Sequence, residues 1–303
     1  MQFLLPNPTN SYQVTENNCE TLVASDSFYS ELEISKKALE KTGVGSPQFI
    51  EKRKLLLPSG YKSWDLGDHW LDEKTRKTIY KKVKRLEEMT GKISFSDQMI
   101  PVTQKNLPDL YDSIFSTILS SEILEFLAEV ELRNVIFKSA QITISSPNVT
   151  QSRYGIFLDK GEKEIKDTLE KLGTKYMHID SSIRISHKLV VYLTDVEPHH
   201  GPFRVVDANK VFCDKIDELA IRKTNDRLRN GPNVLQFLPE KYRARCLFGD
   251  DLETSHPLRG DLLENEVEIL GNAGRATVFN SNCVHRGGFT LRGYRAMLQI
   301  NLK

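Results

Sequence analysis

Two segments of the sequence carry residue types that bind metal ions. His178 and Asp180 stand two residues apart in the first segment, and His285 follows the apolar run 276–279 in the second. Residues i and i+2 of an extended chain project to the same side, so this imidazole and this carboxylate can reach one ion. Two histidines and one carboxylate form the facial triad that holds non-haem Fe(II) and leaves coordination positions open. An open position matters because a co-substrate and dioxygen must both reach the metal.

The triad is not the only interpretation of these residues. A single His-x-Asp pair arises readily by chance, and His178 could instead pair with Asp180 as part of a strand. Two further histidine positions carry weaker signals. His199 and His200 are adjacent, which favours a turn over a shared ion, and His187 is better explained as a core or solvent-facing residue.

The last predicted strand, 294–302, alternates in character and begins near Arg295, ten residues after His285. Its polar side chains are either in water, as on an edge strand, or line a cavity. In a cavity, Arg295 would bind a carboxylate in a bidentate manner. The segment 135–145 shows the same division, with Gln141 and Thr143 on its polar face. Two such strands beside a His-x-Asp and His set fit a sandwich with a polar cavity.

The elements that must position these residues change in type along the chain. Residues 1–130 are predicted to be mainly helical, with clear amphipathic patterns at 73–89 and 110–130. Strands are predicted after that. They fall at 135–145, 189–193, 203–206, 275–279 and 294–302. A polar insertion at 209–266 should contain a helix near 215–229 and a loop near 249–260. Helices followed by strands predict an α+β fold in one domain, 1–303, with a sandwich or barrel over 131–303.

Composition excludes several classes of protein. The chain has 42 Lys and Arg against 41 Asp and Glu, a net charge of +1, which argues against sequence-independent nucleic-acid binding. No apolar run approaches the roughly 20 residues of a membrane span. The four cysteines lie far apart with no C-x-x-C pair, so a disulfide framework is not expected. We therefore expect a cytoplasmic protein without a nucleic-acid or membrane partner.

In order along 135–303, the sequence resembles the phytanoyl-CoA dioxygenase (PhyH-like) branch of Fe(II)/2-oxoglutarate-dependent oxygenases. The resemblance comprises a strand with Gln141, the His178-x-Asp180 pair, the strand 190–196, Gly201-Pro202 before a short strand, His285 and Arg295. The chain departs from the family at 207–210, where Asp-Ala-Asn-Lys replaces Pro-Gly-Ser-His. The two histidines also lie 107 residues apart, which makes the insertion rather long.

The resemblance implies a double-stranded β-helix, a jelly-roll or cupin-like core, with flanking N-terminal helices. His178, Asp180 and His285 would bind Fe(II), with 2-oxoglutarate as co-substrate and O2 as oxidant. Gln141 and Thr143 would be candidates to line the co-substrate or substrate side. Arg295 would hold the distal carboxylate of 2-oxoglutarate. Arg292 competes for this role, but Arg295 is preferred because it opens a strand, whereas Arg292 sits beside a glycine in a turn.

The implied activity is hydroxylation of a C–H bond in a small-molecule metabolite, with release of succinate and CO2. Asp180 favours hydroxylation, because related halogenases lack this carboxylate so that chloride can bind the iron. Two alternatives stay open: a non-catalytic jelly-roll binding protein, and a cupin-type metal-dependent isomerase or hydrolase. The identity of the substrate, the site of oxidation and the oligomeric state are also left open.

Overall fold

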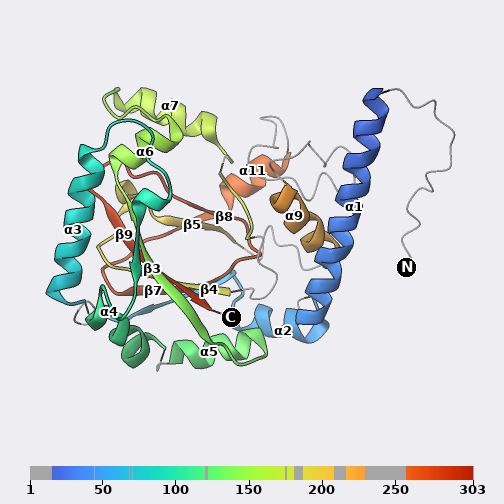
Figure 1. Cartoon of the computed structure of the whole chain (residues 1–303), viewed down its shortest axis with the longest axis horizontal. Helices are drawn as coiled ribbons and strands as arrows, with labels where there is room; N and C mark the ends of the chain where they lie inside the picture. Colours follow the sequence, from blue (N-terminus) through green and yellow to red (C-terminus); the bar gives the residue numbers. More distant parts are fainter. Residues whose placement is uncertain are drawn as a thin grey trace.

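Helices dominate the first part of the chain and cover one side of a large sheet (Figure 1). The computed structural model describes residues 16–43, 45–67, 69, 71–119, 122–174, 176–180, 187–207, 216–228 and 257–302. The helices are α1 (Glu16–Thr42), α2 (Pro47–Leu56), α3 (Glu73–Glu88), α4 (Pro108–Ser113), α5 (Glu122–Glu131), α6 (Pro147–Tyr154), α7 (Glu162–Leu172), α9 (Ile216–Leu228) and α11 (Pro257–Glu264). Among the described helices, none has the length and apolar character needed to cross a membrane.

The two amphipathic patterns of the N-terminal part both form helices. In α3 the Asp72 side chain caps the first turn by accepting from Thr75 N at 2.8 Å, and the apolar stripe is buried. The helical pattern predicted at 110–130 is confirmed, including a second short helix from about residue 122. Its first part, α4, continues into a π-helical turn at Ile114–Ile118, and α5 follows. These helices place an apolar face against the large sheet.

The strands form two antiparallel sheets. The described strands are β1 (Tyr61–Asp65), β2 (Met99–Val102), β3 (Phe137–Ser145), β4 (His187–Tyr192), β5 (Phe203–Val206), β6 (Glu266–Ile269), β7 (Arg275–Asn280), β8 (His285–Gly287) and β9 (Arg295–Leu302). The large sheet has the order β1-β7-β4-β9-β3-β2, and the small sheet has the order β6-β5-β8. The predicted mixture of helices and strands is therefore confirmed.

The strand β9 lies inside the large sheet, between β4 and β3. This position excludes the edge-strand interpretation of its alternating pattern. The edge strands are β1 and β2, which sequence analysis did not predict. Both are short and polar or proline-containing, and Pro101 suits an edge because it lacks an N–H to donate to a further strand.

The large sheet has two different faces. The face toward the helices belongs to one apolar cluster that includes Ile142, Val191 and Leu298, each fully buried. We call this the helix-side face. The opposite face meets the small sheet, where Tyr192 and Phe279 pack with Phe203 of β5. We call this second face the inner face. The odd and even positions of β3, β4 and β9 therefore enter different environments.

The strands β5 and β6, which lie at the two ends of the polar segment 209–266, pair with each other. The helix α9 of this segment matches the helix expected near 215–229 and lies beside α1 in Figure 1. The loop expected near 249–260 is helical from 257 onward in α11, and its earlier part lies outside the described residues. The insertion thus adds helices at one side of the sheets.

Candidate metal centre

The segments of His178 and His285 pair through their backbones. His178 N donates to His285 O at 3.0 Å, and His285 N donates to His178 O at 2.9 Å. Asp180 N donates to Ser281 O at 3.0 Å. The sequence suggested a regular strand here, but His178 forms only an isolated bridge with His285, and Asp180 follows this bridge with its own backbone hydrogen bond to Ser281. This short pairing still gives both side chains the same direction.

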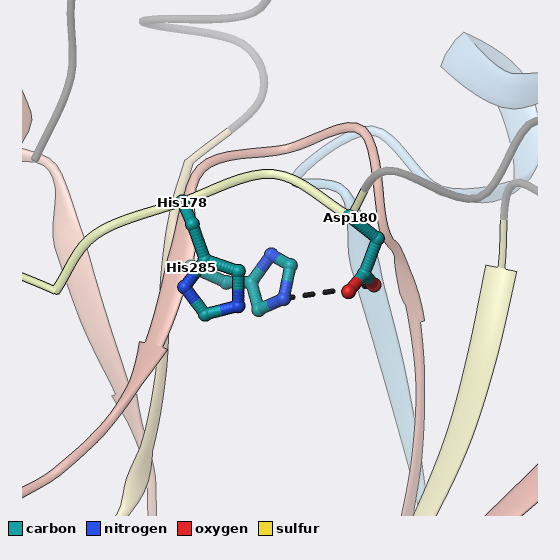
Figure 2. Close-up of side chains that lie close together, drawn as sticks. All are labelled: His178, Asp180 and His285. Carbon is teal, nitrogen blue, oxygen red and sulfur yellow. Dashed lines mark ion pairs between the residues drawn. The ribbon is translucent and has the colours of Figure 1, made fainter. Parts of the chain in front are cut away.

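The three predicted ligands converge. One ligand atom from each of His178, Asp180 and His285 lies within 4.8 Å of the others. Figure 2 shows the two imidazole rings and the carboxylate pointing toward one another. The His285 Nε2 atom lies 3.7 Å from Asp180 Oδ2, and the two imidazole ring centres are 4.5 Å apart. Such a spacing suits three ligands of one ion.

Backbone carbonyls set the orientation of both imidazoles. His178 Nδ1 lies 3.0 Å from Tyr176 O, and His285 Nδ1 lies 2.9 Å from Cys283 O. An Nδ1–H that donates to a carbonyl leaves Nε2 with a free lone pair, which is the tautomer a metal requires. Each histidine therefore uses the carbonyl two residues before it to present Nε2 to the site.

Burial favours the ligating protonation states. Burial, together with the charge of His178, lowers the pKa of His285 to about 3, so this imidazole is neutral near pH 7. Burial opposes ionisation of Asp180, but the charges of His285 and Lys188 outweigh it and hold the pKa of this carboxyl below its usual range. A neutral imidazole and an ionised carboxylate are the forms that bind metal.

Two lysines that sequence analysis missed contact Asp180. Lys188 Nζ lies 2.8 Å from Asp180 Oδ2, and Lys223 Nζ donates to the Asp180 backbone carbonyl at 2.8 Å. Lys188 directly precedes the apolar run 189–193 and shares a face of β4 with Val190, a position that could have identified it. Lys223 lies on α9, so its contact depends on how the insertion packs and has no signal in the sequence.

Arg295 is buried on the inner face, at the start of β9, and is 5% exposed. Its Nη1 donates to Gly201 O, but its Nε has no hydrogen-bond partner in the described part of the chain. Among the described residues, no carboxylate oxygen lies within 4.0 Å of a nitrogen of this guanidinium. Burial lowers the pKa of Arg295, opposed in part by Tyr192 and Tyr154. A buried cation without a counter-ion is suited to bind an anion.

Glycines bring the connections around Arg295 close together. Gly201 has a φ of 71°, in the left-handed region, and its carbonyl is the one that Arg295 contacts. A Cβ on Gly288 would lie 2.4 Å from Pro202 O, so only glycine permits this approach. A Cβ on Gly287 would lie 3.7 Å from Arg295 Nη2. The Arg295 guanidinium therefore lies close to Gly287, two residues after His285 in the sequence.

Arg292, the competing anchor, lies elsewhere. It is exposed in the turn before β9, and its Nη2 lies 3.3 Å from His199 Nε2. The structure thus buries Arg295 near Gly287 and leaves Arg292 exposed. His199 and His200 form a 3-10 turn, in agreement with the sequence, and His187 is a buried core histidine.

Gln141 and Thr143 lie on the inner face of β3, opposite Gln299 and Met297 of β9. Gln141 is half-buried and has a long contact of 3.5 Å with Gln299. The Thr143 hydroxyl is buried, and no described residue forms a hydrogen bond with it. The polar faces of both strands therefore line the interior.

Two hydroxyls that sequence analysis missed lie near Arg295. Ser145 is directly opposite Arg295 in the β3–β9 register, and Thr290 Oγ1 lies 2.9 Å from Ser145 Oγ. Both residues are buried. A separate open groove of about 600 Å³ lies along α3, and none of the residues discussed for the metal centre lines it.

The residues present fit a divalent metal ion. Two imidazoles offer Nε2, and among the described residues the buried Asp180 Oδ2 has an ion-pair contact with Lys188 at 2.8 Å but is left without a well-aligned hydrogen bond. Such an under-coordinated buried oxygen beside two imidazoles is a suitable ligand. Three protein ligands on one side of an ion would leave coordination positions for other molecules.

No family model matches the sequence, and no curated protein sequence matches it. Solved structures with some likeness include EctD from S. alaskensis with 2-oxoglutarate and 5-hydroxyectoine, at 10% identity and a TM-score of 0.42, covering 80% of this chain and 71% of that one. The epimerase SnoN from nogalamycin biosynthesis is 12% identical, with a TM-score of 0.41 and coverage of 88% and 83%. HygX from Streptomyces hygroscopicus, with nickel and 2-oxoglutarate bound, is 13% identical, with a TM-score of 0.40 and coverage of 83% and 85%. Likenesses this distant assign no activity to this chain.

Proposed function

We propose that this protein is an Fe(II)/2-oxoglutarate-dependent oxygenase that hydroxylates a C–H bond of a small-molecule metabolite. The observation that carries the proposal is the convergence of His178, Asp180 and His285, with ligand atoms within 4.8 Å of one another. The proposal includes the fold, in which the two sheets form a double-stranded β-helix with the metal residues at one end.

The site residues and the bound iron would have different roles in the reaction. His178, Asp180 and His285 would hold Fe(II) through two Nε2 atoms and one carboxylate oxygen. Bound iron would supply the oxidation chemistry that couples decarboxylation of 2-oxoglutarate to oxygen insertion. The protein supplies ligands, orientation and a site sheltered from bulk water.

Arg295 would hold the distal carboxylate of 2-oxoglutarate. Its guanidinium is buried, has no carboxylate partner among the described residues and keeps Nε unpaired. It lies close to Gly287, which follows His285 by two residues in the sequence. One small dicarboxylate could therefore contact both the arginine and a metal ion. Ser145 and Thr143, on the facing strand, would complete the polar wall of this pocket.

Loss of a ligand tests the proposal. Asp180→Ala and His178→Ala should each abolish iron-dependent release of succinate from 2-oxoglutarate, while Lys138→Met, an exposed change on β3, should retain it. Normal turnover in both ligand variants would refute the assignment. A protein that binds iron but does not consume 2-oxoglutarate would instead support a cupin-type isomerase or hydrolase. A protein that binds no metal would support a binding role.

A further inference from the structure

Lys188 is a second cation on the inner face, distant from Arg295 along the strands. On β4 it shares a face with Val190 and Tyr192, both in the cluster between the sheets. Arg295 lies past the other end of β4, where Leu193 N donates to Ala296 O at 2.9 Å. Lys188 and Tyr192 are four residues apart, about 13 Å along a strand. The two cations therefore serve different parts of the site.

Backbone pairing gives the order of the groups around the triad. The segment 279–287 pairs with these residues in sequence. Phe279 lies opposite Lys188, Ser281 bonds to Asp180, and His285 bonds to His178. The Arg295 guanidinium comes last, near Gly287. Lys188 and Arg295 thus lie on opposite sides of the three ligands.

The Lys188 ammonium and a metal ion would use the same carboxylate. Lys188 Nζ is 2.8 Å from Asp180 Oδ2, the oxygen that is also 3.7 Å from His285 Nε2. One negative charge cannot neutralise both an ammonium and a divalent cation, so metal binding would leave Lys188 in need of another anion.

The surroundings of Lys188 permit that anion to come from outside. Its side chain is 28% exposed, whereas that of Arg295 is 5% exposed. The preceding residue, His187, is fixed on the opposite face by Glu131 Oε1 at 2.8 Å from its Nδ1. Because this buried pair holds the start of β4, the Lys188 side chain is directed to the inner face.

We propose that Lys188 is a specificity-determining residue that binds an anionic group of the substrate, a carboxylate or phosphate, beside the metal. The inference rests on the proposed function, because it needs a metal ion on Asp180 and a co-substrate on Arg295. The substrate would therefore be an anion. Its negative charge would neutralise the Lys188 ammonium once the metal ion binds Asp180.

Metal affinity is the first test. Lys188→Met, Lys188→Arg and the exposed control Lys138→Met would be titrated with Mn²⁺, with free Mn²⁺ measured by electron paramagnetic resonance. Removal of a competing cation should tighten Mn²⁺ binding by Lys188→Met by about tenfold. The arginine variant and the control should stay within about twofold of the wild type. Unchanged or weaker binding by Lys188→Met would overturn the inference, since a lysine that merely positions Asp180 would aid the metal.

Anion binding is the second test. Protein loaded with Fe(II) and 2-oxoglutarate, without oxygen, would be titrated with acetate and with inorganic phosphate, following the visible band of the iron complex. Wild type and Lys188→Arg should bind one of these probes at least about tenfold more tightly than Lys188→Met, and the better probe identifies the anionic group. Equal binding in all three proteins overturns the inference but leaves the proposed function intact. A wild type with no iron or 2-oxoglutarate binding overturns both.

Discussion

The helix-side face and the inner face of the large sheet use the same strands for different purposes. On β3, Ile142 is fully buried among apolar side chains, while its neighbour Thr143 lies on the inner face, opposite Met297. On β9, Leu298 belongs to the apolar cluster of the helix-side face, whereas Arg295 lies on the inner face. Because successive residues of a strand alternate between faces, one strand can specify the core and the site independently.

The two faces also differ in how well their polar groups are satisfied. On the inner face the buried atoms Thr143 Oγ1 and Arg295 Nε have no hydrogen-bond partner among the described residues. An unpaired buried polar group costs about 1–3 kcal/mol. The helix-side face stabilises the fold, and the inner face keeps groups available for ligands. Stability and ligand binding should therefore respond differently to changes on the two faces.

The largest effect on stability should come from the helix-side face. Ile142→Ala removes a fully buried side chain from the core cluster and should lower the free energy of unfolding by about 2–5 kcal/mol. Thr143→Ala, one residue along on the other face, should lower it by less than about 1 kcal/mol. Urea denaturation of both variants measures the difference. Equal losses would show that the two faces are not distinct.

Arg295 should show the reverse pattern. Arg295→Met removes a buried cation that has no carboxylate partner among the described residues, so stability should hold or rise. Affinity for 2-oxoglutarate should fall about 100-fold, the loss expected for charge-assisted hydrogen bonds. The exposed Arg292→Met is the matched control and should change affinity by less than about twofold. Equilibrium titration of the metal-loaded proteins decides between the two arginines.

Acid should weaken the fold through His285. Its pKa is about 3 in the folded protein against 6.5 for the free side chain, so between these values the unfolded chain binds more protons. Its contribution is complete above pH 6.5 and falls as the pH decreases. Between pH 6.5 and 4.5 the loss should be about 2–3 kcal/mol. Denaturation with a chelator present measures it, and His285→Gln should show a smaller dependence; an identical dependence would assign it to other groups.

The smallest effect concerns a single hydroxyl. Thr143→Val replaces an unpaired buried hydroxyl by a methyl group, so the free energy of unfolding should stay the same or rise by less than about 1 kcal/mol. The KM for 2-oxoglutarate or substrate should change a few-fold, because the polar wall loses a group. Thr143→Ser should restore the wild-type KM. A large loss of stability in the valine variant would place Thr143 in the core.

Much of the fold could be predicted because the sequence patterns are strong. The apolar run 189–193 and the alternation along 294–302 indicate strands with the observed boundaries within about two residues. The edge strands β1 and β2 were missed, since short polar segments carry little periodicity and gain their order from the neighbouring strand. His178 and Asp180 were predicted to lie on a strand, but His178 forms only a single bridge to His285 of β8, and Asp180 bonds to Ser281 before that strand.

The sequence by itself determined which residue types are available: His178, Asp180 and His285 as ligands, and an arginine at the start of an alternating strand. Only the tertiary structure decided that these groups meet, that Arg295 is buried where Arg292 is exposed, and that Lys188 contacts Asp180. The physical reason is distance along the chain. Alternation is a local property of a strand, whereas the approach of residues a hundred positions apart depends on how the two sheets pack.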